Sequence, residues 1–206
     1  HSIQAKVIFN PIPKIFFLKN NSKIKKKNND VSLVAVSRFD PIKRIYFLIK
    51  IIKNLKSKIP KIQLIIVGDG YQFNRVKRYI KSEKLEKNIK LAGWKKNVQP
   101  YHDTSKFYIS CSASETISVS LLEAMNRNCI PIVNKVGGNS EVVINNINGY
   151  IFKMDDLKKT SSIIYKILKN NDIDQNIVKE SINKKFSSKK FNNKFGKYLN
   201  KLHFNY

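Results

Sequence analysis

Several residue types are scarce in this chain of 206 residues. Only two cysteines occur, Cys111 and Cys129, which are too few for a disulfide scaffold and fit a reducing compartment. No apolar run approaches the roughly 18 residues that a membrane-spanning helix needs. Acidic residues number 14 against 40 basic ones. Hydrophobic residues nevertheless make up 42% of the chain, enough for a sizeable core, so the chain is not intrinsically disordered.

The shortage of acidic residues gives a formal net charge of +26, which attracts polyanions over a long range. Only five of the 40 basic residues are arginine, the residue that most often reads bases and phosphates, and the rest are lysine. We therefore expect no nucleic-acid partner. A basic, non-catalytic α/β module that binds nucleic acid or other polyanions remains the alternative interpretation. The same charge would also favour peripheral contact with an anionic membrane surface.

The chain divides into three segments by its pattern. Residues 1–30 contain two prolines and a tract rich in Lys and Asn, which is typical of a linker. Over residues 31–175, short β-rich runs alternate with longer stretches of helical period. Residues 176–206 carry apolar positions among many lysines and predict one or two amphipathic helices.

The alternation predicts an α/β fold with a Rossmann-like parallel sheet and helices on both faces. The expected strands are 33–36, 63–67, 89–91, 107–110 and 130–134. The expected helices cover about 45–55, 73–86, 118–127, 139–145 and 155–170, the first of them begun by Pro41. In an open sheet of this kind, ligands bind at the carboxyl ends of the strands.

Polar residues and glycines follow all five expected strands, in the loops 37–43, 68–70, 93–94, 111–118 and 135–139. Five such loops at one edge of a parallel sheet predict a single anion-binding cleft. Arg38 and Lys43 are placed to neutralise a diphosphate, although either could equally be a surface charge. Gly137 and Gly138 would bring backbone amides close to the same ligand, unless they merely form a tight turn.

Two acidic residues, Glu115 and Glu123, flank the start of a predicted helix at a separation of slightly more than two helical turns. Both carboxylates can therefore face one groove. Glu123 lies in an apolar stretch, where a carboxylate is costly unless hydrogen-bonded, and vicinal ribose hydroxyls would satisfy it. The alternative is a helix cap for Glu115 and a solvated rim position for Glu123. The free amides of the same helix, after Ser114–Ser118, favour a phosphate or a sugar hydroxyl.

Together these motifs resemble the donor-binding domain of glycosyltransferase family 4, retaining enzymes of the GT-B fold. The segments that carry the resemblance are V-S-R-F-D-P-I-K (36–43), I-V-G-D-G (66–70), S-E-T-I-S-V-S-L-L-E-A-M (114–125), P-I-V (131–133), V-G-G-N-S-E (136–141) and N-G-Y-I-F (148–152). The likeness covers about residues 31–200. The chain departs from the family pattern at Ser37, at Thr116-Ile117 and at Asn128. The change at Thr116-Ile117 leaves the identity of the donor open.

The resemblance implies the C-terminal half of a GT-B enzyme, with the acceptor-side N-terminal domain missing. Residues 1–30 would be the interdomain linker, 31–175 the donor-binding domain and 176–206 helices that cross back over the first domain. The enzyme would move a hexose or N-acetylhexosamine from a UDP-, GDP- or similar sugar to a glycan or lipid-linked acceptor. It would do so in the cytoplasm or at the inner membrane face, in polysaccharide or lipopolysaccharide synthesis. No metal or other cofactor is expected, and this segment alone should turn over little or nothing.

The resemblance also assigns roles by motif position. Arg38 and Lys43 would hold the diphosphate, Glu115 would face the donor sugar, Glu123 would bind the ribose hydroxyls and Trp94 would lie beside the nucleobase. The other expected donor-binding residues are Gly68, Gly70, Ser114, Thr116, Ile117, Ser118, Gly137 and Gly138. A glycosidase fits less well, because its two acids flank the scissile bond. A Rossmann dehydrogenase lacks its G-x-G-x-x-G fingerprint here.

Overall fold

The computed structural model describes residues 31–186 and 188–203, which contain a six-stranded sheet in the order β3-β2-β1-β4-β5-β6. All neighbouring strands pair in parallel. The strands are β1 (Ser32–Val36), β2 (Gln63–Val67), β3 (Ile89–Gly93), β4 (Phe107–Ser110), β5 (Ile130–Asn134) and β6 (Tyr150–Phe152). The strands after β1 are added first on one side (β2, β3) and then on the other (β4, β5, β6), so the topological switch point lies between β1 and β4. Ligands bind at this point in such sheets. The predicted fold class is confirmed.

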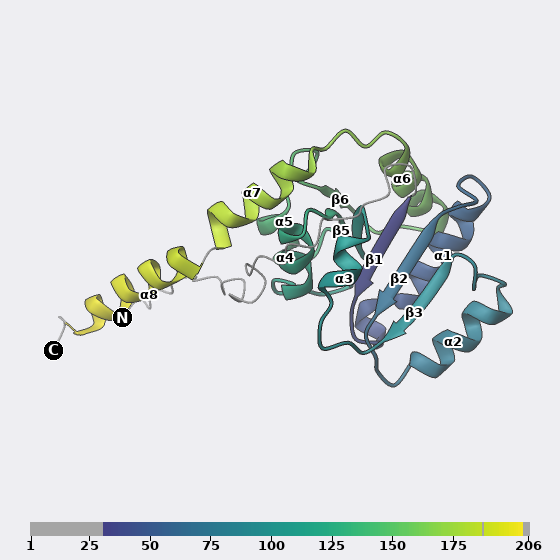
Figure 1. The fold of residues 1–206 in the computed structure, drawn as a ribbon, viewed down its shortest axis with the longest axis horizontal. Coiled ribbons are helices and arrows are strands. Elements are labelled where there is room, and N and C mark those ends of the chain that lie inside the picture. Colours follow the sequence, from purple (N-terminus) through teal and green to yellow (C-terminus); the bar gives the residue numbers. More distant parts are fainter. Residues whose placement is uncertain (1–30, 187, 204–206) are drawn as a thin grey trace.

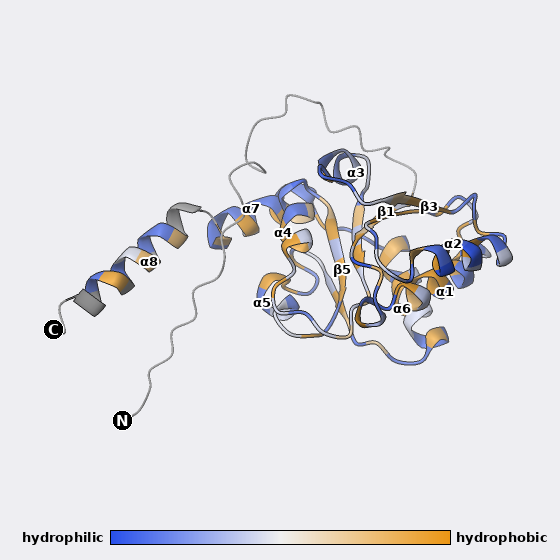
Figure 2. Ribbon diagram, turned by 90° about the horizontal axis from the view of Figure 1, so that it is seen from below, coloured by the Kyte–Doolittle hydropathy of each residue, from blue (hydrophilic) through white to orange (hydrophobic). Residues whose placement is uncertain are grey.

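Helices cover both faces of this sheet. They are α1 (Ile45–Lys56), α2 (Phe73–Ser82), α3 (Gln99–Asp103), α4 (Val119–Asn126), α5 (Asn139–Val142), α6 (Leu157–Lys169), α7 (Gln175–Phe186) and α8 (Ser188–His203), with a short 3₁₀ turn, η2 (Pro41–Lys43). Figure 2 shows α3 on one side of the strands and α1, α2 and α6 on the other. Helix α1 packs on α6, and α4 packs on α7. None of the described helices has the length and apolar character needed to cross a bilayer.

The core follows the apolar periodicity of the sequence. All five residues of β5 are buried, as expected for a strand covered on both faces. Helix α1 buries apolar side chains at three- and four-residue steps, including Leu48, Ile52 and Leu55, so one stripe faces the sheet. The two faces of the sheet are therefore closed by apolar packing, and the loops at the carboxyl ends of the strands carry polar residues.

The observed elements differ from the expected ones mainly at short or irregular segments. Strands β2, β4 and β5 have the expected bounds, whereas the sequence interpretation missed α3 and β6, which have only five and three residues. Helix α2 ends at Ser82 rather than near 86, because Lys84 turns into the left-handed region with φ 53°. Helix α5 ends at Val142 rather than near 145, because Val143 is already extended.

The two ends of the chain are described to different extents. The expected linker, 1–30, lies outside the described residues. The expected terminal helices are present as α7 and α8, and α8 extends away from the sheet (Figure 1). The rings of Phe191 and Phe195 stack on α8 with centroids 5.6 Å apart. That these helices cross back over another domain stays a prediction.

A buried ion pair between the ends of α3 and α4 offers a test of this packing. Arg127 donates through Nε and Nη2 to the two Asp103 carboxylate oxygens at 2.6 and 2.5 Å, and the side chains are only 9% and 14% exposed. Asp103→Ala would leave the guanidinium buried without its counter-charge. We expect the free energy of unfolding, measured by chemical denaturation, to fall by about 3 kcal/mol.

Asp155→Ala is the matched control, because it removes the largely exposed pair with Lys159. Solvent screens such pairs, so the unfolding midpoint should barely move. Equal losses in the two variants would contradict the assignment of a structural role to Asp103.

Candidate functional site

The loops that follow β1, β2 and β3 contact one another through their backbones. The Ser37 amide donates to the Val67 carbonyl, and the Gly68 amide donates to the Gly93 carbonyl, both at 2.9 Å. Gly68 has φ +138°, and a Cβ there would lie 1.9 Å from the Ser37 carbonyl oxygen. Only glycine permits this approach, so the glycine serves contact between loops.

The loops that follow β1, β4 and β5 meet in the same manner. The Ala113 amide donates to the Ile42 carbonyl at 2.7 Å, and the Gly138 amide donates to the Thr116 carbonyl. Gly137 has φ +46°, and a Cβ there would lie 1.5 Å from the Glu115 carbonyl oxygen. The five predicted loops thus form one continuous rim. Because the Gly138 amide is engaged by Thr116, contact between these glycines and a ligand stays a prediction.

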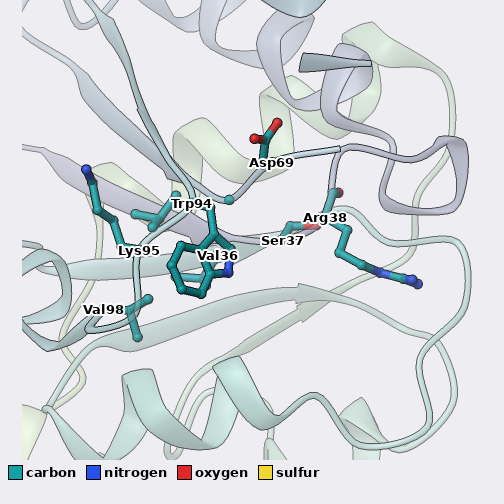
Figure 3. Close-up of a pocket in the computed structure, with 9 residues that line it drawn as sticks. Val36, Ser37, Arg38, Asp69, Trp94, Lys95 and Val98 are labelled. Carbon is teal, nitrogen blue, oxygen red and sulfur yellow. Dashed lines mark hydrogen bonds between the residues drawn. The ribbon is translucent and has the colours of Figure 1, made fainter. Parts of the chain in front are cut away.

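A pocket of about 240 Å³ opens at the β1–β2–β3 part of this rim (Figure 3). Its lining consists of Val36, Ser37, Arg38, Val67, Gly68, Asp69, Trp94, Lys95 and Val98. Trp94 shares this lining with Val36 and Val98, and because the residue is 69% exposed, its indole is accessible to a ligand (Figure 3). The guanidinium of Arg38 points away from Trp94 (Figure 3).

The structure therefore brings three predicted residues, Arg38, Gly68 and Trp94, into one pocket. Sequence reasoning did not select Val36, Val98 or Lys95, because apolar strand ends and one lysine among many carry no distinguishing signal.

An ion pair joins the loops after β1 and β4. Lys43 Nζ lies 2.6 Å from Glu115 Oε1, and the two side chains are only 17% and 12% exposed. Ser112 Oγ donates to the same oxygen at 2.8 Å. Lys43 is thus not an ordinary surface charge. Glu115 is not a helix cap either, because the Ser118 hydroxyl accepts the Leu121 amide at the start of α4.

Arg38 is held much more loosely than Lys43. Its side chain is 79% exposed, and its only ion pair among the described residues is with Asp40 at 3.3 Å. Exposed pairs of this kind contribute little free energy. The guanidinium can therefore turn towards an anion at the rim without losing a strong contact.

Glu123 is half-buried on α4 between the buried Leu122 and Ala124. Its carboxylate accepts no hydrogen bond from the described residues, and burial raises its pKa to about 7. Glu123 is therefore less solvated than the alternative of a rim position assumes. Burial, with the charges of Glu115 and Glu123, also raises the pKa of Tyr108 to about 12.

The remaining predicted residues line the rim in different ways. Ser114 and Thr116 are exposed, Ile117 is partly buried, and the Ser118 hydroxyl caps α4. The Gly70 amide donates to the carboxylate of its neighbour Asp69 at 2.7 Å.

Cys111 lies in the loop that follows β4. Burial raises the pKa of its thiol to about 12, so it is not a nucleophile near neutral pH.

A six-stranded parallel sheet in this order, with helices on both faces, has the architecture of one half of a GT-B glycosyltransferase. The chain belongs to the family described as "Glycosyl transferases group 1", whose sequence model matches residues 17–184. The resemblance to a GT-B glycosyltransferase is therefore confirmed at the level of this family.

Curated relatives and solved structures agree with this membership. The chain is 24% identical to the N-acetyl-alpha-D-glucosaminyl L-malate synthase of Bacillus anthracis over 86% of its own length and 48% of the relative's. It is 28% identical to the poly(glycerol-phosphate) alpha-glucosyltransferase of Bacillus subtilis over 77% of itself and 22% of the relative. Thus the chain spans at most about half of these two relatives.

Among solved structures, the fold matches Anabaena Alr3699/HepE in complex with UDP and glucose. The TM-score is 0.81 at 21% identity, over 95% of this chain and 56% of that one. A glycosyltransferase from Rickettsia africae matches with a TM-score of 0.79 at 20% identity, over 98% and 58%.

The raised pKa of Glu123 predicts a pH-dependent stability. Between the ordinary value of 4.5 and about 7, the folded state keeps a proton that the unfolded state releases, so wild-type stability falls as pH rises. Glu123→Gln removes this pH-dependent loss of stability, because a glutamine side chain does not ionise. We expect the variant to melt at a higher temperature than wild type at pH 8 and the difference to shrink towards pH 5.

Glu86→Gln, at an exposed carboxylate, provides the control for this experiment and should follow the wild-type pH profile. A melting-temperature difference for Glu123→Gln that stays constant from pH 5 to pH 8 would exclude a raised pKa at Glu123.

Proposed function

We propose that this chain is the donor-binding half of a retaining, family 4 glycosyltransferase that uses a UDP-sugar. The enzyme transfers a hexose or an N-acetylhexosamine to a glycan or lipid-linked acceptor. The observation that carries the proposal is the continuous rim of five loops, with the Trp94 pocket at one part and the Lys43–Glu115 pair at another. Solved neighbours that hold UDP support the choice of nucleotide.

The nucleoside occupies the pocket between β1, β2 and β3, with the base against the exposed Trp94 indole. The ribose hydroxyls donate to the Glu123 carboxylate, which accepts no hydrogen bond from the described residues. The diphosphate lies between Arg38 and Lys43, and the sugar lies next to Glu115.

The reaction breaks the bond between the anomeric carbon and the diphosphate, and negative charge grows on the leaving oxygens. Arg38, Lys43 and the amino end of α4 stabilise that charge without rearrangement of the loops, because backbone hydrogen bonds already fix the loops. The acceptor binds to a separate domain, so the isolated chain binds donor and turns over little.

The first test of the proposal is calorimetric titration with UDP. Arg38→Ala removes a charged donor to the diphosphate and should weaken UDP binding by about 1.5–3 kcal/mol. Arg78→Ala, at another exposed arginine on α2, is the control and should leave the affinity unchanged. Equal UDP affinities of wild type and Arg38→Ala would show that Arg38 does not bind the diphosphate.

The net charge of +26 favours the alternative of a polyanion-binding module. Titration with duplex DNA at two salt concentrations separates the two functions. Tight, steeply salt-dependent DNA binding together with no UDP binding would establish the alternative instead.

A second prediction concerns the base. Trp94→Ala removes the aromatic face of the pocket and should weaken UDP binding about tenfold, the scale of base stacking on an aromatic ring. Trp94→Phe should retain most of the affinity. Tyr71→Ala is the control, since Tyr71 is 70% exposed and does not line the pocket. A similar loss in Trp94→Ala and Tyr71→Ala would speak against stacking.

A further inference from the structure

The two oxygens of the Glu115 carboxylate have different surroundings. Oε1 accepts hydrogen bonds from Lys43 Nζ at 2.6 Å and from Ser112 Oγ at 2.8 Å. Oε2 accepts none from the described residues. One oxygen is therefore fixed by the protein, and the other is available to a hydroxyl of a bound molecule.

The two donors to Oε1 differ in how firmly they are held. Lys43 carries its charge at the end of a flexible side chain and can donate three hydrogen bonds in several directions. Ser112 has a short side chain that is only 2% exposed, and its carbonyl accepts the Asn134 Nδ2 group at 2.9 Å.

Asn134 is itself 4% exposed and is anchored twice more. Its Oδ1 accepts the Met154 amide at 3.0 Å, and its carbonyl accepts Asn139 Nδ2 at 3.0 Å. The position of Ser112 is therefore fixed by a buried network that does not involve Lys43.

A diphosphate at the rim would compete with Glu115 for the Lys43 ammonium. Once Lys43 turns towards phosphate oxygens, the Ser112 hydroxyl is the remaining described donor to Oε1. Without it, the carboxylate could rotate away from the bound sugar.

We propose that Ser112 is a positioning residue that holds the Glu115 carboxylate in place while Lys43 engages the donor diphosphate, so that Oε2 receives a hydroxyl of the donor sugar. This inference rests on the proposed function and adds a residue that the motif assignments did not include. It predicts that Ser112 contributes to the affinity for the sugar part of the donor and not to the affinity for the nucleotide part.

The experiment compares UDP with UDP-glucose, UDP-galactose and UDP-N-acetylglucosamine by calorimetry on the whole chain. The readout is the ratio of the Kd of UDP to the Kd of the tightest-binding UDP-sugar. Ser112→Ala should reduce this ratio about tenfold, the size of one lost hydrogen bond to a charged group, and leave the Kd of UDP within twofold. Ser161→Ala, a buried serine on α6 that is 5% exposed, is the matched control and should leave the ratio unchanged.

A double-mutant cycle separates positioning from a general loss of stability. Glu115→Ala should abolish the sugar-dependent ratio, and adding Ser112→Ala to it should cause no further change. A further reduction in the double variant, or an unchanged ratio in Ser112→Ala, would overturn the proposal. A wild-type chain that binds UDP no less tightly than every UDP-sugar would overturn it too, while leaving the nucleotide site intact. A wild-type chain that does not bind UDP would refute the proposed function itself.

Discussion

Backbone contact between neighbouring loops at the carboxyl edge of the sheet is the constraint on which the rest of the site depends. At Gly68 and Gly137 the chain passes so close to the next loop that a methyl group would overlap a carbonyl oxygen. These approaches convert five separate turns into one rim. The charged side chains do not create the rim, because they are carried by loops that the backbone has already fixed.

The charged side chains along this rim differ in how strongly they are paired and in how far they are shielded from solvent. Lys43 and Glu115 neutralise each other in a shielded position, whereas the one ion pair of Arg38 within the described part of the chain is the largely exposed pair with Asp40. Glu123 has no ion-pair or hydrogen-bond partner among the described residues, and its partial burial raises its pKa to about 7. Of the two cations proposed to hold the diphosphate, Arg38 is therefore loosely held, and Lys43 would have to exchange Glu115 for the anion.

The sequence predicted the sheet and the order of its loops because long periodic segments such as 45–55 and buried strands such as 130–134 carry strong patterns. It could not predict β6 or α3, because three and five residues are too few to show a period. The loop motifs also placed Lys43 and Glu115 at one edge. That they form an ion pair depends on residues 72 positions apart meeting in space, which no local pattern reveals. The Ser112–Glu115 hydrogen bond spans only three positions, but no motif distinguished Ser112 from the other serines of this loop.

The interlocking of the loops also limits how such a domain can diversify. The turn that carries Thr116 and Ile117 is tied to Gly137 and Gly138 by a carbonyl contact and by the Ile117 side chain, which would collide with a Cβ at Gly138. A new side chain on one turn therefore has to be accommodated by the other. Evolution of this part of the rim would therefore proceed by paired changes in two separate stretches of sequence, one around Thr116 and Ile117 and the other at Gly137 and Gly138.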